Sequence, residues 1–490
     1  MTSGRNLYLI LIFFIPKLII SQEAIGISMD NYSGVWGGQL NPASLTQNKT
    51  YVDINIIGGS FHFSNNFAYI PPGDPSFFGP FPIDTLRPIY GEFDYNGYYT
   101  YYKNTSDKWI SLSTKIMGPS AMFQYNRHAF AFTSSLKTYG SGISFPWEIP
   151  VFAYEDLTYE PLQKQRFNDK DFGINELVWS EFAFSYANEI YKKRDVSISV
   201  GITGKLLFGI AAVYNTYKKV DYKVLDEKNI LFYNLNSDVA YAYVENIDNI
   251  DVSLLSPGNS NGFGLGADIG IVYKKVKKPT NYYDNGKACK FPYEDYLYKI
   301  GFSILDIGNI KFSKNAEQHN YYARNTLLNI DSLPDFNDQT TVSEYLRSLS
   351  EILTGDPDSS FVDSSFRVNL PTAASLQFDW HIKNPYYLSF LWVQPITFKT
   401  KNARRPAQIA VIPRFENRFF GISLPVSLLN YRTFRTGLSI RIYNLTIGTE
   451  SLGTLLDFRN LDNVDLYFSL KFNLQKGRCD ISHKDACYGW

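Results

Sequence analysis

Two sets of polar side chains in the second half of the chain have spacings that could bring them together. Gln377, Asp379 and His381 alternate with apolar residues, and Arg435 and Arg441 do the same in a later segment. Residues two positions apart lie on one face of a strand, so each set would point in one direction. They could form a polar eyelet or a clamp that binds a ligand. They could equally be the ordinary polar lining of a barrel.

A hydrolase is the enzymatic alternative, because Asp379, His381 and several serines are present. The chain has one G-x-S-x-G sequence, Gly258-Asn-Ser-Asn-Gly262, but a strand is expected to follow it, not the helix that a nucleophile elbow requires. The run Gly262-Phe-Gly-Leu-Gly266 is no dinucleotide fingerprint, since its third glycine is misplaced and a strand is expected to follow. We therefore expect no enzyme, no catalytic residue and no cofactor.

Metal-ligating residues are scattered. The five histidines lack ligand spacing, which makes a zinc enzyme improbable. Asp331, Asp335 and Asp338 could hold calcium in a loop, but hydrated turn residues explain them as well, and we predict no metal site. Cys479 and Cys487 could form a disulfide in an oxidising compartment, which would leave Cys289 unpaired.

Charge and composition exclude other classes of protein. Lys plus Arg and Asp plus Glu each total 47 of the 490 residues, so no basic excess points to nucleic acid. Charged residues make up only 19% of the chain, whereas aromatic residues reach 17%. The aromatic surplus needs a structural explanation.

The first residues resemble a secretory signal peptide. Arg5 precedes an apolar run over residues 7–15, and Ser21 supplies a small residue for cleavage. The run is too short to cross a bilayer, and no longer apolar run follows. We predict a signal peptide over residues 1–21; an amphiphilic start to a soluble domain is the alternative.

The body of the chain has the two-residue period of β-strands. Between Leu466 and Leu474 apolar residues alternate strictly with polar ones, and the pattern recurs along the chain. We predict an all-β fold with fourteen strands, near residues 51–64, 108–125, 128–137, 176–190, 195–217, 261–275, 293–312, 368–382, 386–398, 406–415, 419–427, 432–442, 445–450 and 463–474.

Loop lengths decide between two kinds of β protein. One end would carry mostly tight turns, and the other would receive the long segments 65–107, 138–175, 218–260 and 313–367. This asymmetry is typical of a closed antiparallel transmembrane barrel, in which aromatic girdles explain the Tyr and Phe surplus. A soluble secreted β-rich binding module is the alternative, because a sandwich also alternates.

Two segments within the long loops are ambiguous. Residues 230–245 would form a hairpin above the membrane; as part of the wall they would raise the count to sixteen. Residues 341–353 carry apolar side chains at helical spacing and end before Gly355. They predict a short lid helix, whose apolar stripe ordinary loop packing would explain as well.

The segment Asn31-Tyr-Ser-Gly-Val-Trp-Gly-Gly-Gln-Leu-Asn-Pro-Ala43 resembles the Asn-Pro-Ala opening of a group of outer-membrane barrels. The group includes FadL-type fatty-acid channels, an uncharacterised Bacteroidota family and the shuttle barrel of type IX secretion. Later matches to the Bacteroidota family are Gly118-Pro-Ser120, the run 301–308, Leu370-Pro-Thr372, Ile422-Ser-Leu-Pro425 and Ile447-Gly448. The resemblance implies fourteen strands with an N-terminal segment inside the lumen.

This interpretation divides the chain into a plug (22–50), a barrel (51–474) and a periplasmic tail (475–490). Asn41 and Pro42 suit a plug, because Asn caps a turn and Pro fixes φ; an irregular lead-in is the alternative. The leading functional hypothesis is an outer-membrane channel for a small hydrophobic ligand, by analogy with the fatty-acid channels. The rival is a non-transporting barrel that acts with secretion or envelope-assembly proteins. The expected contacts are outer-membrane lipid and no nucleic acid.

Overall fold

A computed structural model describes residues 24–72, 100–193, 195–243, 260–277, 293, 295–334, 341–396 and 403–476, together with the backbone of 478–479 and 487–488. The predicted signal peptide and Cys289 lie outside these ranges.

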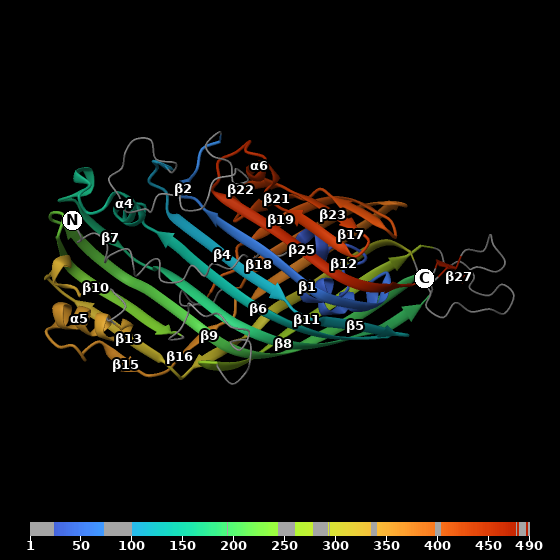
Figure 1. Cartoon of the computed structure of the whole chain (residues 1–490), viewed down its shortest axis with the longest axis horizontal. Helices are drawn as coiled ribbons and strands as arrows, with labels where there is room; N and C mark the ends of the chain where they lie inside the picture. The colour runs from blue at the N-terminus through green and yellow to red at the C-terminus, as the bar shows by residue number, and fades with distance from the viewer. Residues whose placement is uncertain are drawn as a thin grey trace.

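The wall is a closed ring of fourteen antiparallel strands (Figure 1). Strand β25 pairs with β1 over Thr50–Ser64, and this pairing closes the ring. A short break splits four wall strands into two named pieces each. In ring order the wall consists of β1 (Thr50–Asn65), β4 (Lys108–Met117) with β5 (Ser120–Tyr125), β6 (His128–Phe145), β8 (Phe172–Lys193), β9 (Val196–Val224), β11 (Gly262–Val276), β12 (Tyr296–Phe312), β16 (Phe366–Asn369) with β17 (Ala373–Lys383), β18 (Tyr386–Pro395), β19 (Gln408–Glu416), β20 (Phe420–Ser423) with β21 (Val426–Leu429), β22 (Thr433–Thr436) with β23 (Leu438–Ile442), β24 (Leu445–Thr449) and β25 (Asn463–Gln475). The predicted fold class and strand count are confirmed.

The apolar face of these strands points outward. Phe378 and Trp380 are 38% and 46% exposed, whereas Gln377 and Asp379, on the opposite face of β17, are 8% and 4% exposed. Phe468 on β25 is also exposed, at 41%. A soluble sandwich would bury these side chains, but here they form an apolar outer surface that is typical of a membrane barrel.

The two ends of the barrel differ as predicted. Tight turns join β5 to β6, β8 to β9, β17 to β18, β19 to β20 and β23 to β24 at one end, which we call the turn end. At the other end, which we call the loop end, β10 (Asn229–Ala242) pairs with the distal half of β9, while β11 pairs with the proximal half. Residues 229–242 of the ambiguous segment therefore form a strand beyond the wall, and the count stays at fourteen.

The loop end carries a folded apolar core that lies outside the ring. Helix α5 (Val342–Thr354) begins with a capping box between Thr341 and Glu344 and ends at Gly355, as the sequence predicts. Its buried Tyr345 and Leu346 belong to the same apolar cluster as Val151 and Phe152 of α4. The accompanying elements are α4 (Glu148–Glu155), η3 (Glu160–Leu162), β7 (Arg166–Asp169), β13 (Ala316–Ala323), β14 (Thr326–Asn329), η6 (Ile330–Ser332), β15 (Phe361–Asp363), α6 (Leu452–Leu455), β2 (Ala68–Tyr69) and β3 (Thr100–Tyr101). Within the described ranges, none of the helices combines the length and apolarity needed to cross a membrane.

Residues 24–49, which we call the N-terminal segment, lie inside the ring. The segment comprises α2 (Ile25–Ser28), α3 (Val35–Leu40) and η1 (Pro42–Gln47), and Ile25, Trp36 and Leu45 are almost fully buried. Figure 1 shows these blue helices enclosed by the wall towards the end where the C-terminus lies. The segment therefore occupies the half of the lumen nearer the turn end.

Candidate functional site in the barrel lumen

The Asn41-Pro42 turn is held against three neighbouring strands. Asn41 Nδ2 donates to Gln377 Oε1 at 2.8 Å and to the main-chain carbonyls of Ile271 and Phe302 at 3.2 and 3.3 Å. Asn41 Oδ1 accepts from the Ala43 N–H at 3.0 Å and so caps η1. The Asn-Pro turn of the resemblance is thus one fixed point of the N-terminal segment.

Glycines in the wall make room for this turn. A Cβ at Gly270 would lie 2.1 Å from Asn41 Oδ1, and a Cβ at Gly201 would lie 2.5 Å from the carbonyl carbon of Pro42. The two glycines are register partners on β11 and β9. The wall is therefore recessed where the turn contacts it, because only glycine allows so close an approach.

A second fixed point is a buried ion pair on another arc of the ring, at β23. Arg441 Nε donates to Asp30 Oδ2 at 2.8 Å, and Arg441 also donates to the carbonyls of Arg418 and Asn417 in the β19–β20 turn. Burial alone would raise the pKa of Asp30, but Arg441 and the Tyr32 N–H outweigh it and hold the pKa below its ordinary value. Asp30 is therefore a buried carboxylate that is fully compensated.

Asp379 is the centre of a hydrogen-bond network that extends to the N-terminal segment. Its oxygens accept from Arg414 Nη2 at 2.7 Å, Ser389 Oγ at 2.9 Å and Tyr296 OH at 2.6 Å, and Lys299 Nζ lies 3.2 Å away. Such a set satisfies a buried carboxylate fully.

The network reaches Asn31 of the N-terminal segment from two sides. Asn31 Oδ1 accepts from Lys299 at 2.8 Å and from Tyr296 at 3.0 Å, while Asn31 Nδ2 donates to Glu416 Oε2 at 2.8 Å. Arg414 bonds both Asp379 and Glu416. Asp30 and Asn31 are thereby docked to β12, β17, β19 and β23.

The five predicted lumenal residues all face inward, but they do not form one ligand clamp. Gln377 and Asp379 hold the N-terminal segment directly or through the network, and Arg441 holds it from the other arc. His381 bonds the Tyr296 carbonyl at 3.1 Å and stacks on Tyr387. Arg435 lies elsewhere, 3.7 Å from Asp465.

Sequence reasoning missed several members of the network, namely Asp30, Asn31, Tyr296, Lys299, Arg414 and Glu416. One signal was present. Lys299, Arg414 and Glu416 are charged residues at inward positions of alternating strands, and a charged residue at such a position needs a partner.

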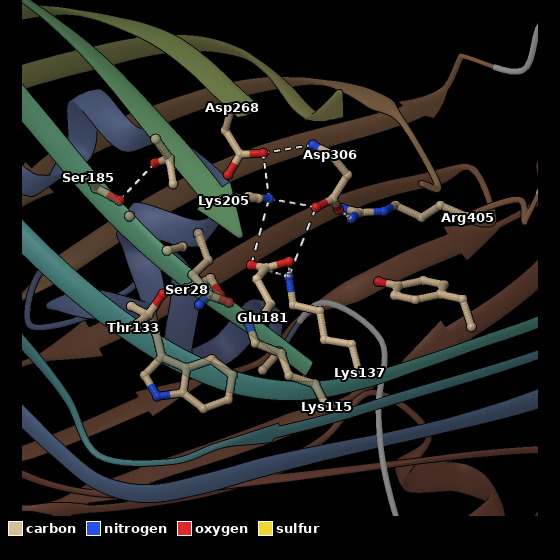
Figure 2. A pocket seen from close by; sticks show the side chains of 17 residues that line it. Ser28, Lys115, Thr133, Lys137, Glu181, Ser185, Lys205, Asp268, Asp306 and Arg405 are labelled. Carbon is tan, nitrogen blue, oxygen red and sulfur yellow. Dashed lines mark hydrogen bonds and ion pairs between the residues drawn. The ribbon is translucent and has the colours of Figure 1, made fainter. Parts of the chain in front are cut away.

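A second charged group, which we call the lumenal ion cluster, fills the lumen beside the N-terminal segment. Lys205 Nζ lies 2.6 Å from both Asp268 Oδ1 and Asp306 Oδ1, and Lys137 Nζ lies 2.8 Å from Glu181 Oε1. Figure 2 shows Lys205 between these carboxylates, with Arg405 approaching Asp306 from the other side. Three cations thus meet three carboxylates, and the cluster has no formal net charge.

Arg405 comes from a connection that folds inward. The segment 403–407 precedes β19; Ala403 and Arg405 are buried, and the Arg404 N–H donates to Ser141 Oγ on β6 at 3.2 Å. This connection therefore crosses the lumen between two distant parts of the wall.

An apolar layer follows on the loop-end side of the lumenal ion cluster. Tyr139, Trp179 and Leu207 each lie two residues beyond a charged member of the cluster on the same strand face. They pack with other buried inward residues: Leu177, Tyr214, Ile310, Phe312, Phe366, Val368 and Leu370. The lumen therefore contains the N-terminal segment, the ion cluster and this apolar layer in sequence.

Little space is left between these layers. The cavity beside the ion cluster has a volume of about 30 Å³, and the cavity between the N-terminal segment and β12 and β17 about 70 Å³. Spaces of this size hold about one to a few water molecules. Neither accommodates a small organic ligand, which needs about 300 Å³ or more.

The predicted disulfide lies at the edge of the described structure. Strands β26 (Arg478–Cys479) and β27 (Cys487–Tyr488) pair so that Cys479 and Cys487 are register partners. Their side chains lie outside the described residues, and the disulfide stays a prediction.

Comparison with solved structures finds barrels of low similarity. The deltaS2S3 mutant of the TodX monoaromatic hydrocarbon channel has a TM-score of 0.41 and 8% identity, with 90% of this chain and 95% of that chain covered. The toluene transporter TbuX of Ralstonia pickettii has a TM-score of 0.39 and 9% identity, with 90% and 94% covered. A FadL homologue of Pseudomonas aeruginosa has a TM-score of 0.26 and 10% identity, with 93% and 98% covered. At these scores the fold assignment rests on the closed ring itself.

No curated protein matches the chain. A family model described as a family of unknown function, DUF5723, matches residues 42–450, which begin at Pro42 and include thirteen of the wall strands. This chain belongs to the DUF5723 family.

Proposed function

We propose that this protein is an outer-membrane channel that the N-terminal segment holds closed. The observation that carries the proposal is the anchoring of one buried segment to separate strands of the ring, through Asn41 and Gln377 on β17 and through Asp30 and Arg441 on β23. A segment that only filled space would need no such buried ion pair, because apolar packing is at least as stabilising. Polar anchors instead allow a second arrangement in which water replaces the lumenal partners.

The apolar outer face and the difference between the two ends support the proposed outer-membrane location. The turn end would face the periplasm and the loop end the exterior, as in bacterial barrels. The apolar core at the loop end would then stand above the membrane.

The nature of the lumen favours a small hydrophilic solute. The family resemblance implies a hydrophobic ligand, but the spaces next to the N-terminal segment are lined mainly by charged and polar side chains. The side chains of the apolar layer are buried against one another. A hydrophobic solute would have to pass the ion cluster, which strongly disfavours apolar groups.

A bilayer conductance measurement tests closure. The full-length protein should show little conductance, and a variant lacking residues 24–47 should conduct measurably more, although the ion cluster and the apolar layer still narrow its lumen. Gel electrophoresis with and without boiling shows whether both proteins are folded, because a folded barrel migrates differently after it is boiled. A deletion variant that folds but conducts no better than the full-length protein would contradict the proposal.

The rival function, a non-transporting barrel in secretion or envelope assembly, is favoured by the large apolar core at the loop end. Exposed Tyr322, Leu327 and Phe361 lie on strands of this region. The same experiment separates the two functions, because a partner barrel would remain closed after the N-terminal segment is removed.

A second experiment separates hydrophilic from hydrophobic solutes. It compares the swelling of proteoliposomes in sugars and amino acids with their uptake of an aromatic hydrocarbon.

A further inference from the structure

A cavity of about 790 Å³, which we call the vestibule, lies at the turn end. Its lining includes Gln47 of the N-terminal segment, Gln124 of β5, Arg127 of the β5–β6 turn, and Lys274 of β11. This volume is within the range of sites for small organic ligands and is more than tenfold larger than either inner cavity. Neither the family nor the proposed channel assigns a role to it.

The vestibule has buried hydrogen-bonding atoms without protein partners. The amide oxygens Gln47 Oε1 and Gln124 Oε1 and the hydroxyl of Tyr293 are buried and accept or donate no hydrogen bond within the protein. Gln47 and Gln124 are 6% and 8% exposed, and their amide nitrogens are already engaged: the former donates to Ser199 and the latter to the Thr46 carbonyl. Each oxygen is therefore positioned to accept a hydrogen bond from a bound group that carries O–H or N–H.

The same cavity is lined by an excess of basic residues. Arg127, Lys192, Lys274 and Lys476 line it, against the single carboxylate of Glu189. The formal charge of the lining is therefore +3, and Glu189 lies 4.0 Å from Lys192. A concave surface with this charge raises the local concentration of anions. Arg127 supplies the planar donor set that suits phosphate and carboxylate groups.

We infer that the vestibule binds a small polyhydroxylated anion, such as a sugar phosphate or a sugar acid. The anionic group would lie against the basic side chains, and the hydroxyls would donate to the two glutamine oxygens. Tyr51 and Tyr293 also line the cavity. A neutral sugar would bring no charge to the basic side chains, and inorganic phosphate lacks the sugar hydroxyls that would donate to the glutamine oxygens.

The inference does not depend on conduction, because binding is measured on the closed barrel. Thr46 and Gln47 line the vestibule and belong to the N-terminal segment, so a ligand there would contact the element that closes the lumen.

Isothermal titration of the full-length barrel in detergent tests the inference, with glucose 6-phosphate as the probe and glucose and inorganic phosphate as comparisons. Saturable binding of glucose 6-phosphate, at least about tenfold tighter than binding of either comparison, is expected. Arg127→Gln should weaken that binding about tenfold, because it removes a charge-assisted contact. Lys314→Gln, an exposed cation at the loop end, is the matched control and should change nothing.

Gln124→Met removes the acceptor while keeping the length of the side chain, and should abolish the preference over inorganic phosphate. Gln47→Met provides a second test if the first variant does not show the heat-dependent shift of a folded barrel. Absence of saturable binding, equal affinity for inorganic phosphate in the unmodified protein, or binding unchanged by Arg127→Gln would each overturn the inference. If the barrel conducts but does not bind glucose 6-phosphate, the inference about the vestibule fails and the proposed channel function stands. If the barrel binds glucose 6-phosphate but no variant conducts, the proposed channel function fails and the inference about the vestibule stands.

Discussion

Arg441 and Asp30 stand 411 positions apart in the chain, yet Arg441 Nε donates to Asp30 Oδ2 at 2.8 Å inside the barrel. This contact joins the N-terminal segment to a strand near the end of the chain. Because both side chains are buried, loss of either one would weaken the attachment of the N-terminal segment to the wall.

Replacing Arg441 by Gln should release one side of the N-terminal segment. The substitution leaves the buried Asp30 carboxylate without its main partner, at a cost of about 3–5 kcal/mol. We expect a higher frequency of open events in single-channel recordings. The control is Arg367→Gln, an exposed arginine at the loop end; identical recordings for Arg441→Gln and the control would count against the ion pair as an anchor.

Closure should depend on pH in one direction. Because the pKa of Asp30 lies below its ordinary value in the folded protein, the ion pair contributes fully above the unfolded pKa of about 3.9. Its contribution is lost as the pH falls through the lower, folded pKa.

Conductance measured from pH 8 downwards should therefore stay low through neutral and mildly acidic solution and rise only in strong acid. Asp30→Asn should conduct more than the unmodified protein at neutral pH, with a weaker acid response. Opening of the unmodified protein near pH 6 would show that another group controls closure.

The glycine recess predicts a steric route to the same result. Gly270→Val places a side chain where Asn41 Oδ1 lies, because even a Cβ would come within 2.1 Å. The N-terminal segment must then move, and conductance should rise although no charge has changed. Gly204→Val is the control, since a Cβ there meets nothing within 4 Å. Gly204→Val should conduct no more than the unmodified protein.

The lumenal ion cluster should be sensitive to loss of its central cation. Lys205→Met removes the cation that lies 2.6 Å from both Asp268 and Asp306, at a cost of about 3–5 kcal/mol. The unfolding temperature of the barrel, measured by the change in its gel migration after heating, should fall. Adding Asp268→Asn should restore part of the loss, and Lys218→Met, at a half-exposed lysine, should have little effect. Equal transition temperatures for all these proteins would show that the cluster contributes little to stability.

The outward face should tolerate no charge where it meets lipid. Phe378→Arg places a cation on the exposed face of β17, which costs about 2–4 kcal/mol near the bilayer midplane. Urea titration of protein folded into lipid vesicles measures this loss. Glu351→Arg, on the exposed side of α5, is the control. A loss no larger than that of the control would mean that Phe378 does not face lipid.

Much of the architecture could be predicted from the chain alone. The alternation around Phe378 and Phe468 predicts both the strands and their two unlike faces, because side chains in a strand alternate between the faces. The long segment before β16 and the tight turn after β17 predict opposite ends. The Thr341 and Gly355 signals predict α5, since capping is a local interaction.

The site depended on information that no local pattern contains. Gln377, Asp379 and Arg441 could be placed on the inner face, but their partners Asn41, Arg414 and Asp30 come from distant parts of the chain. A strand's period determines which way a side chain points, and says nothing about which residue stands opposite across a closed ring. Sequence determined the strands, their faces and the two ends; the register of the closed ring decided which charges meet, because partner identity is a property of three-dimensional distance.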